Sequence, residues 1–283
     1  MAENTEVFEV GVMCDVLDVS RSGFYAWRER PESERESESV RLATLVEKIH
    51  EESRKTYGVA RMHAELRALG EKCGRHRVAR LMREKELHGR VRRRYRTTTK
   101  ADARHPVAPN LLERDFSAQR PDQVWVGDIT YLWTREGWLY LAVLIDLYSR
   151  IVVGWSMSER MPVGLTLAAL DMAVRRRRPA AGLIHHSDRG SQYTAKAYQK
   201  RLREFGGRPS MSRKGNCYDN AVAESFFHSL KTELMDEFPF DTRSQARAKV
   251  FDYIEVFFNR RRRHSTLGYV SPAEFEQMAK AVA

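Results

Sequence analysis

The sequence predicts an α/β protein, with a mixed five-stranded sheet and flanking helices preceded by an all-α helix-turn-helix region. Two observations predict this fold class. Residues 124–132, 138–148 and 150–157 are rich in β-branched, aromatic and other apolar side chains, and short turns separate them. Before residue 100, apolar residues instead recur at helical spacing in a series of short segments.

Further along the chain, the predicted strands alternate with helices. The first three strands should form an antiparallel meander, because only short turns such as Glu136-Gly137 join them. Beyond them, the pattern predicts a helix at 163–177, a strand at 183–187, a helix at 194–205, a short strand near 208–213 and a helix after Asn220. This order of elements is the ribonuclease-H-like layout.

Three acidic residues lie where such a sheet would place a catalytic site. Asp128 is in the middle of an apolar strand, where a carboxylate is costly without a partner. Asp188 follows directly after strand 183–187, at the end where ligands bind in open α/β sheets. Glu224 is on a helix whose apolar stripe lies on a different face. That stripe consists of Val222, Phe226, Leu230 and Leu234.

These residue types indicate metal-dependent chemistry at phosphate. Three convergent carboxylates repel one another unless a cation neutralises them, and they suit Mg²⁺ or Mn²⁺. Two such ions can hold the attacking and leaving oxygens of a phosphoryl displacement. Lys231, about two helical turns after Glu224, should project from the same face and contact a phosphate near the reacting bond. The alternative is that the three carboxylates are unrelated surface acids.

Other polar residues of the predicted core have simpler explanations. Asp146 also lies in an apolar strand, but turn capping or a buried hydrogen bond accounts for it, so we expect a structural role. His185 and His186 should point to opposite faces of their strand, one into the core and one out of it. A zinc site at Cys73 and His76 is not expected, because no second ligand pair follows at the required spacing.

Composition favours a polyanionic partner. The 283 residues allow roughly two domains. With 49 Lys and Arg against 38 Asp and Glu, the net charge is +11, and ribosome or membrane-surface binding is the alternative explanation. Three well-separated cysteines suggest a reducing cytosol. We expect no membrane segment, because the longest apolar run, 139–148, contains Asp146 and is too short to cross a bilayer.

Three basic segments are candidates for DNA contact. Helices predicted at 60–69 and 75–87 flank a glycine-containing turn, which makes the second one a recognition-helix candidate; a solvated basic face is the alternative. The run at 90–96 and the cluster after the helix near 260 suit phosphate binding. The residues expected to contact DNA are Arg75, Arg77, Arg80, Arg92, Arg93, Arg94, Arg260, Arg261, Arg262 and Arg263.

The predicted organisation has five parts. Residues 1–39 are a short helical segment with an acidic linker, although the acidic stretch also suits a solvated helix start. Residues 40–100 form the helix-turn-helix-like DNA-binding domain with its basic tail, and 101–120 form a linker. Residues 121–235 are the catalytic core, and 236–283 are a C-terminal helical extension that carries the last basic cluster.

Several phrases of the sequence resemble those of the insertion-sequence-3 family of DDE transposases, and specifically the second-frame (orfB) protein with an integrase-type catalytic core. Gly127 departs from many relatives, which carry Thr or Ala there. The resemblance spans nearly the whole chain. The phrases that carry it are at residues 125–131, 186–193, 215–221, 224–233 and 259–269.

The resemblance implies a ribonuclease-H-like fold and DNA strand cleavage and transfer at the ends of an insertion sequence. It further implies that Asp128, Asp188 and Glu224 bind two Mg²⁺ (or Mn²⁺) ions. Implied partners are double-stranded DNA, as terminal repeats and target, further copies of the chain, and a first-frame product or a frameshift fusion to it. The expected location is the bacterial cytoplasm, at the nucleoid. The alternatives are a metal-dependent DNA nuclease and a non-catalytic DNA-binding regulator; the intact carboxylates argue against the regulator.

Overall fold

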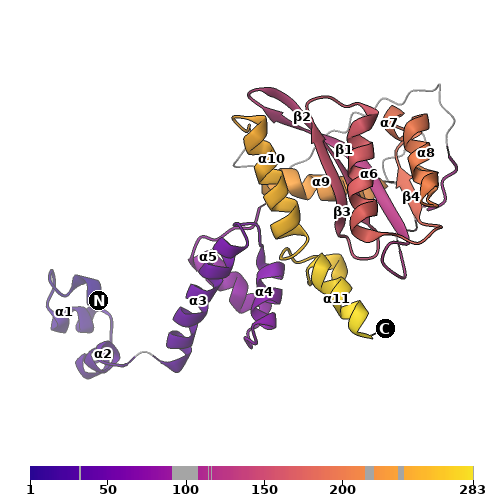
Figure 1. The fold of residues 1–283 in the computed structure, drawn as a ribbon. Helices are drawn as coiled ribbons and strands as arrows, with labels where there is room; N and C mark the ends of the chain where they lie inside the picture. Colours follow the sequence, from indigo (N-terminus) through magenta and orange to yellow (C-terminus); the bar gives the residue numbers. More distant parts are fainter. Residues whose placement is uncertain are drawn as a thin grey trace.

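A mixed five-stranded sheet forms the centre of the larger part of the molecule (Figure 1). The computed structural model describes residues 1–31, 33–90, 108–113, 115, 117–213, 220–234 and 239–282. The strands lie in the order β3-β2-β1-β4-β5, with the first three antiparallel and β4 and β5 parallel to β1 and to each other. Their bounds are β1 Val124–Thr134, β2 Gly137–Asp146, β3 Val152–Ser158, β4 Ile184–Ser187 and β5 Arg208–Met211. The predicted ribonuclease-H-like sheet is confirmed.

Helices cover both faces of this sheet. On β2, Ala142 and Leu144 face the layer of α6 (Val163–Arg177), whereas Leu141 and Val143 face the opposite layer, as strand alternation requires. The opposite layer contains α9 (Ala221–Glu233) and α10 (Arg243–Phe251), which continues as the π-helical turn η4 (Asp252–Phe258). Beside α6 lie α7 (Ser191–Thr194) and α8 (Lys196–Glu204). Strand β3 approaches α6 closely at Gly154, where a Cβ would collide with the carbonyl oxygen of Ala169.

The helix-turn-helix unit is a three-helix bundle (Figure 1). Its core contains Leu42, Met62, Leu66, Val78 and Leu81, all nearly inaccessible to solvent. The helices are α3 (Glu34–Glu52), α4 (Val59–Ala68) and α5 (Arg75–Glu84). Helix α3 begins earlier than its apolar stripe predicts, because Ser33 and Glu36 form a reciprocal capping box at its start.

Two short helices precede this unit, and a short helical tail ends the chain. The first pair is α1 (Val10–Val16) and α2 (Arg21–Arg28), after a 3₁₀ turn, η1 (Ala2–Asn4). The tail consists of η5 (Ser265–Leu267) and α11 (Pro272–Val282). Across the part of the chain that the structure describes, every helix is too short or too polar to span a membrane.

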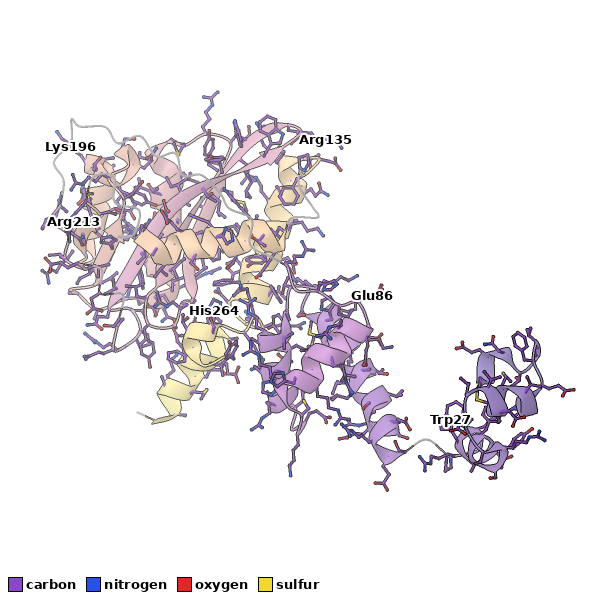
Figure 2. All side chains as sticks on the ribbon, turned by 180° about the vertical axis from the view of Figure 1, so that it is seen from behind. Trp27, Glu86, Arg135, Lys196, Arg213 and His264 are labelled. Carbon is purple, nitrogen blue, oxygen red and sulfur yellow. The ribbon has the colours of Figure 1, made fainter. Side chains whose placement is uncertain are left out.

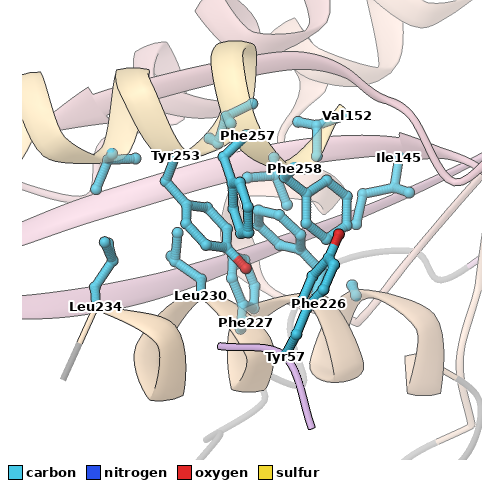
Figure 3. Close-up of a cluster of buried hydrophobic side chains, with 14 of the residues drawn as sticks. Tyr57, Ile145, Val152, Phe226, Phe227, Leu230, Leu234, Tyr253, Phe257 and Phe258 are labelled. Carbon is cyan, nitrogen blue, oxygen red and sulfur yellow. The ribbon is translucent and has the colours of Figure 1, made fainter. Parts of the chain in front are cut away.

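The helix-turn-helix unit is docked against the C-terminal segment. Tyr57, which precedes α4, lies in the aromatic cluster beside Phe226 (Figure 3). Its hydroxyl donates to the carbonyl oxygen of Arg261 and accepts from the backbone N–H of Arg263 at 2.8 Å. Arg263 also pairs with Glu65 of α4. These contacts bring the predicted DNA-binding unit into one packed cluster with helix α9.

Candidate active site

Strand β1 places Asp128 on the side of the sheet that faces α9. Its neighbours of the same parity, Val126 and Leu132, belong to the cluster that packs against that helix. The side chain is half-buried and accepts a hydrogen bond from the backbone N–H of Ile129 at 2.8 Å. Burial raises its pKa well above the usual value, and the charges of Asp188 and Glu224 raise it further.

Asp188 comes directly after β4, in a turn that its own carboxylate shapes. The backbone N–H of Gly190 donates to Asp188 Oδ1 at 3.0 Å, and a Cβ at Gly190 would lie 2.9 Å from that oxygen. Arg189 Nε donates to the carbonyl oxygen of Ser212 at 2.7 Å and so ties the turn to the end of β5. Burial raises the pKa of Asp188, against the opposing effect of the Gly190 hydrogen bond.

Glu224 is in the first turn of α9. The predicted apolar stripe holds this helix on the sheet, since Phe226 and Leu230 are buried and Val222 packs against the same cluster. Glu224 is half-buried at the rim of that contact, and burial raises its pKa. Residues 214–219, immediately before α9, lie outside the described part of the chain.

The three carboxylates are close enough for their charges to interact, because the charges of Asp188 and Glu224 both raise the pKa of Asp128. Among the described residues, no three His, Cys, Asp or Glu side chains are gathered tightly enough to form a ready-made ion site. The donor set nevertheless fits a hard cation, because all three side chains offer carboxylate oxygens. At Asp128 the charges of Asp188 and Glu224 add to the effect of burial on the pKa, and a divalent cation would offset that local negative charge.

Lys231 is the basic group whose charge acts on Asp128. It lowers the pKa of Asp128, and Asp128 in turn favours the charged form of Lys231. The dominant effect on Lys231 is burial, which lowers its pKa. Its Nζ atom lies 4.8 Å from the centroid of the Tyr131 ring. Lys231 is therefore near both Asp128 and an aromatic side chain further along β1.

Asp146 is structural, as predicted. It is fully buried, and its Oδ1 atom accepts from the backbone N–H of Asp122 at 2.8 Å. Its Oδ2 atom accepts from both the backbone N–H and the hydroxyl of Ser149, at 2.9 and 2.8 Å. The carboxylate thus caps the turn between β2 and β3, and burial raises its pKa to about 6.

The prediction that one of His185 and His186 points out of the core is wrong. Both are buried, because His185 packs against Tyr193 and Tyr198 of α7 and α8 and His186 lies against Ser210 of β5. His185 Nε2 lies 3.1 Å from the hydroxyl of Tyr198, and burial lowers the pKa of His185 to about 3. His186 Nδ1 lies 2.8 Å from Ser210 Oγ.

The predicted recognition helix α5 exposes two of its three candidate arginines. Arg75 is exposed at the start of the helix, and Arg80 is exposed with Glu84 3.6 Å away. Arg77 is half-buried, and it bonds Glu38 and Ser39 of α3 at 2.8 and 2.9 Å, so part of its role is to hold the bundle together. Arg92, Arg93 and Arg94 lie outside the described residues.

The C-terminal arginine cluster divides into two exposed and two internal side chains. Arg260 and Arg261 are exposed. Arg262 is only 3 % exposed and forms an ion pair with Glu233, with Nη2 2.6 Å from Oε1. This removes Arg262 from the predicted DNA contacts, since a phosphate cannot reach a guanidinium whose donors face a buried carboxylate. Arg263 bonds Glu65 and the carbonyl oxygen of Tyr269 and is mostly occupied within the protein.

Two features of the structure were not predicted from the sequence. Glu233, at the end of α9, is buried and forms an ion pair with Arg262. A single acidic residue near a helix end gives no indication in the sequence that it will be buried in an ion pair. The exposed aromatic residues Tyr131, Trp133 and Trp138 lie on the β1–β2 hairpin next to Lys231. For them a signal existed, because bulky aromatic residues occupy the positions of β1 that alternate with buried ones.

Comparison with known proteins gives matches along almost the entire chain. Residues 118–217 and 224–279 match integrase core domain families, and residues 38–95 match an HTH-like domain. A 31 kDa protein of insertion element IS600 from Shigella sonnei is 48 % identical over 265 residues, covering 94 % of this chain and 97 % of that protein. The transposase InsF of insertion sequence IS3A from Escherichia coli K12 is 46 % identical over 271 residues, covering 95 % and 94 %.

Solved structures give more distant matches. A simian T-cell lymphotropic virus intasome, in complex with the PP2A regulatory subunit B56 gamma, matches with a TM-score of 0.48 and 14 % identity, over 81 % of this chain and 73 % of that one. The HTLV-2 integrase catalytic core domain in complex with magnesium matches with a TM-score of 0.42 and 15 % identity, over 56 % and 99 %.

The family is decided by the sequence relatives. Near-half identity to the proteins of two insertion elements extends over almost their full length. The HTH-like and integrase core matches occur in the order that the fold shows, with the helical bundle before the sheet. The chain therefore belongs to the IS3 family of insertion-sequence transposases, enzymes of the DDE polynucleotidyl transferase class.

Proposed function

We propose that Asp128, Asp188 and Glu224 form the catalytic site with which this transposase cleaves DNA at the ends of its insertion sequence and joins those ends to a target. The observation that carries the proposal is the electrostatic coupling at Asp128, whose pKa is raised by burial and by the charges of both other carboxylates. A structural acid such as Asp146 is instead satisfied by hydrogen bonds from its own turn.

Each carboxylate is held by a different element, so their oxygens are presented with little freedom. Asp128 is fixed by β1, Asp188 by its turn with Gly190, and Glu224 by the packing of α9. Together they would hold two Mg²⁺ or Mn²⁺ ions. When bound, these ions supply positive charge to the reacting phosphate and orient its oxygens.

The two reactions use the same exchange of bonds at phosphorus. In cleavage, a water oxygen bonds to phosphorus as the bond to the 3′ oxygen breaks, and the 3′ oxygen leaves as a hydroxyl. In joining, the oxygen of that hydroxyl bonds to a target phosphorus, and a target strand oxygen leaves as a new hydroxyl. No covalent bond to the protein is needed, so one site serves both steps.

The DNA would contact the chain at several basic positions. Arg75 and Arg80 on α5 are exposed and would contact phosphates or bases of the terminal repeats. Arg77, which is half-buried, would contact the DNA with the part of its side chain that remains exposed. Arg260 and Arg261, and Lys231 beside Asp128, would contact backbone phosphates, as would Arg92, Arg93 and Arg94. Pairing of two element ends would require further copies of the chain. A first-frame product, either free or fused to this chain by a frameshift, would help to recognise the ends of the element. These reactions would take place in the bacterial cytoplasm, at the nucleoid.

A joining assay tests the proposal directly. A duplex with a pre-cut 3′-hydroxyl end and a labelled target is incubated with the protein and Mg²⁺, and joined product is measured alongside cleavage of an uncut end. We expect the wild type to do both. Glu224→Gln should abolish both and keep duplex binding, whereas the control Glu204→Gln, an exposed carboxylate on α8, should remain active.

The same assay separates the alternatives. Cleavage without joining by the wild type would support the plain nuclease. Duplex binding with neither reaction would support a non-catalytic regulator. An active Glu224→Gln variant would show that the wrong carboxylate has been assigned.

A further inference from the structure

Three aromatic side chains form an exposed strip on the β1–β2 hairpin. Tyr131, Trp133 and Trp138 are 41 %, 45 % and 43 % exposed, which is high for such large apolar groups. Trp133 and Trp138 are directly opposite each other in the strand register. The Trp138 ring lies edge-on to both others, with centroids 4.6 Å from Trp133 and 4.9 Å from Tyr131. The rings therefore form one continuous surface, here called the aromatic strip.

The aromatic strip begins beside the candidate active site. Tyr131 is three residues after Asp128 on β1, so its side chain leaves the opposite face of the strand. Lys231 of α9 is near both, since its charge acts on Asp128 and its Nζ lies 4.8 Å from the Tyr131 ring centroid. Pairing of β1 with β4 ends at Gly127, so the strip occupies the part of the hairpin that extends past the parallel strands. Figure 2 shows Arg135 at the tip of this hairpin.

Hairpin stability alone does not account for the outward position of these rings. Cross-strand aromatic pairs do stabilise hairpins. The hairpin is already anchored by its inner side, where Leu132, Thr134 and Leu139 are essentially inaccessible to solvent. Three adjacent large rings left in solvent next to a charged lysine mark a surface that a ligand covers.

We propose that the aromatic strip binds unpaired nucleobases of the DNA strand whose phosphate is held at Asp128, Asp188 and Glu224. Nucleobases stack on aromatic side chains, and a base offers a free face only when it is unpaired or terminal. Lys231 supplies positive charge where the phosphate of the same nucleotide would lie. This assignment rests on the proposed function for the position of that phosphate.

The combination of rings and charge favours DNA over a second protein copy. Lys231 lies at one end of the aromatic strip, and the exposed Arg135 lies at the other, with its Nε 3.2 Å from Asp241 Oδ1. Positive charge at both ends matches an anionic strand carrying apolar bases. A protein interface would need a much larger complementary area than three side chains provide. Self-association is therefore treated as an outcome of the test.

The test measures binding without chemistry. In EDTA, the full chain is titrated with two labelled terminal-repeat duplexes, one blunt and one ending in a short unpaired 3′ strand, and anisotropy gives both affinities. We expect tighter binding of the unpaired end by the wild type. The double variant Trp133→Leu/Trp138→Leu, which keeps apolar bulk but removes the ring faces, should lose about tenfold affinity for the unpaired end alone.

Matched variants keep the result interpretable. Trp27→Leu is the control, because Trp27 is also exposed but lies on α2, away from the hairpin (Figure 2). Trp133→Phe/Trp138→Phe retains rings and should restore most of the affinity, and thermal melts establish that each variant is folded. Stacking should also quench tryptophan fluorescence on addition of the unpaired end, and the leucine double variant should lose that quenching.

Several results would overturn the assignment. The wild type could show no preference for the unpaired end, or the leucine double variant could keep that preference in full. Sedimentation could show that the leucine substitutions change self-association while affinity for the unpaired end is unchanged, which would make the strip a protein interface. Failure of the proposed function would give a different result: the wild type would not join strands in the presence of Mg²⁺, but in EDTA it would still prefer the unpaired end.

Discussion

Arg262 and Glu233 form a buried ion pair that joins the chain after η4 to the last turn of helix α9, with Nη2 2.6 Å from Oε1. Tyr253 donates its hydroxyl to Glu233 Oε2 at 2.8 Å. Arg61, from the helix-turn-helix unit, approaches Glu233 Oε1 at 3.7 Å. The helix that carries Glu224 and Lys231 is thus tied at its far end to the proposed DNA-binding unit.

Removal of Arg262 should destabilise the fold rather than merely weaken DNA binding. Arg262→Ala leaves the Glu233 carboxylate buried without its main cation, which costs about 3–5 kcal/mol in comparable cases. The exposed Arg260 is the matched control, and Arg260→Ala should change stability by less than about 0.5 kcal/mol. Urea unfolding of both variants decides this. Equal stabilities would show that the Arg262–Glu233 pair is not what anchors α9.

Magnesium should stabilise the folded protein more at high pH than at low pH. Folding raises the pKa values of Asp128, Asp188 and Glu224, so their ionisation lowers stability as pH rises from near 4, the unfolded value, through the raised values. A divalent cation favours the ionised form and reverses this loss. The melting temperature with MgCl₂, against NaCl at equal ionic strength, should therefore rise clearly at pH 8 and little at pH 4. EDTA should remove the increase, and Glu224→Gln should reduce it; a pH-independent increase would contradict the assignment.

Asp146→Asn should lower stability and leave joining activity measurable. One carboxylate oxygen would become an NH₂ donor facing the N–H donors of Asp122 or Ser149, at a cost of about 1–3 kcal/mol. The wild-type residue has a pKa of about 6 in the folded state, above its unfolded value, so its contribution to stability falls as pH rises from about 4 to about 6. Asp146→Asn should lack that pH dependence. A stable but inactive variant would place Asp146 in the chemistry instead.

The exposed arginines of α5 should control the salt dependence of DNA binding. Each arginine that binds a phosphate contributes about one to the slope of log affinity against log salt, so Arg75→Ala/Arg80→Ala should lower that slope by about two. Arg41→Ala, which removes an arginine of α3 that is paired with Glu71, serves as the control and should leave the slope unchanged. Binding of the full chain to its terminal repeat is measured across a salt series. An unchanged slope in the double variant would show that Arg75 and Arg80 bind no phosphate.

Lys231→Ala should weaken binding of the transferred end without removing the magnesium effect on stability. Lys231 is near Asp128 but donates no metal ligand, so the carboxylates would still bind the cation. The substitution removes the positive charge next to Tyr131 and, with it, the expected bond to phosphate. Affinity for the end is measured in EDTA, and melting temperature is measured with and without MgCl₂. Full end affinity would count against Lys231 as a phosphate-binding residue.

Most elements of the fold were predictable because each carries its own local pattern. The helix at 163–177 and the strands around Asp128 and Asp188 follow directly from periodicity and turn residues. The first turns of α3 are polar and could equally belong to a linker, because they contain no apolar residues at helical spacing that would indicate a helix. The Ser33–Glu36 capping box is a sequence signal that would have placed the start of this helix.

The candidate site could be predicted only where a residue type and its position in the fold agree. Asp128 in a strand and Asp188 at a strand end meet that condition, and the structure brings their charges together with that of Glu224. The four consecutive arginines do not, because which of them turns inward depends on where Glu233 and Glu65 lie in space. The orientation of His185 and His186 also depended on how completely later segments cover the sheet.

The packing of Tyr57 and Glu65 against the C-terminal arginines limits how this protein can change the element ends that it recognises. A recognition module attached only through a linker could be exchanged whole between relatives. Here an exchanged module would bring its own half of a buried interface. Side chains that do not fit there would disturb the contacts that hold α9 in place. New specificity is therefore expected to arise through substitutions on the outer face of α5, while the face of α4 toward Arg263 stays fixed.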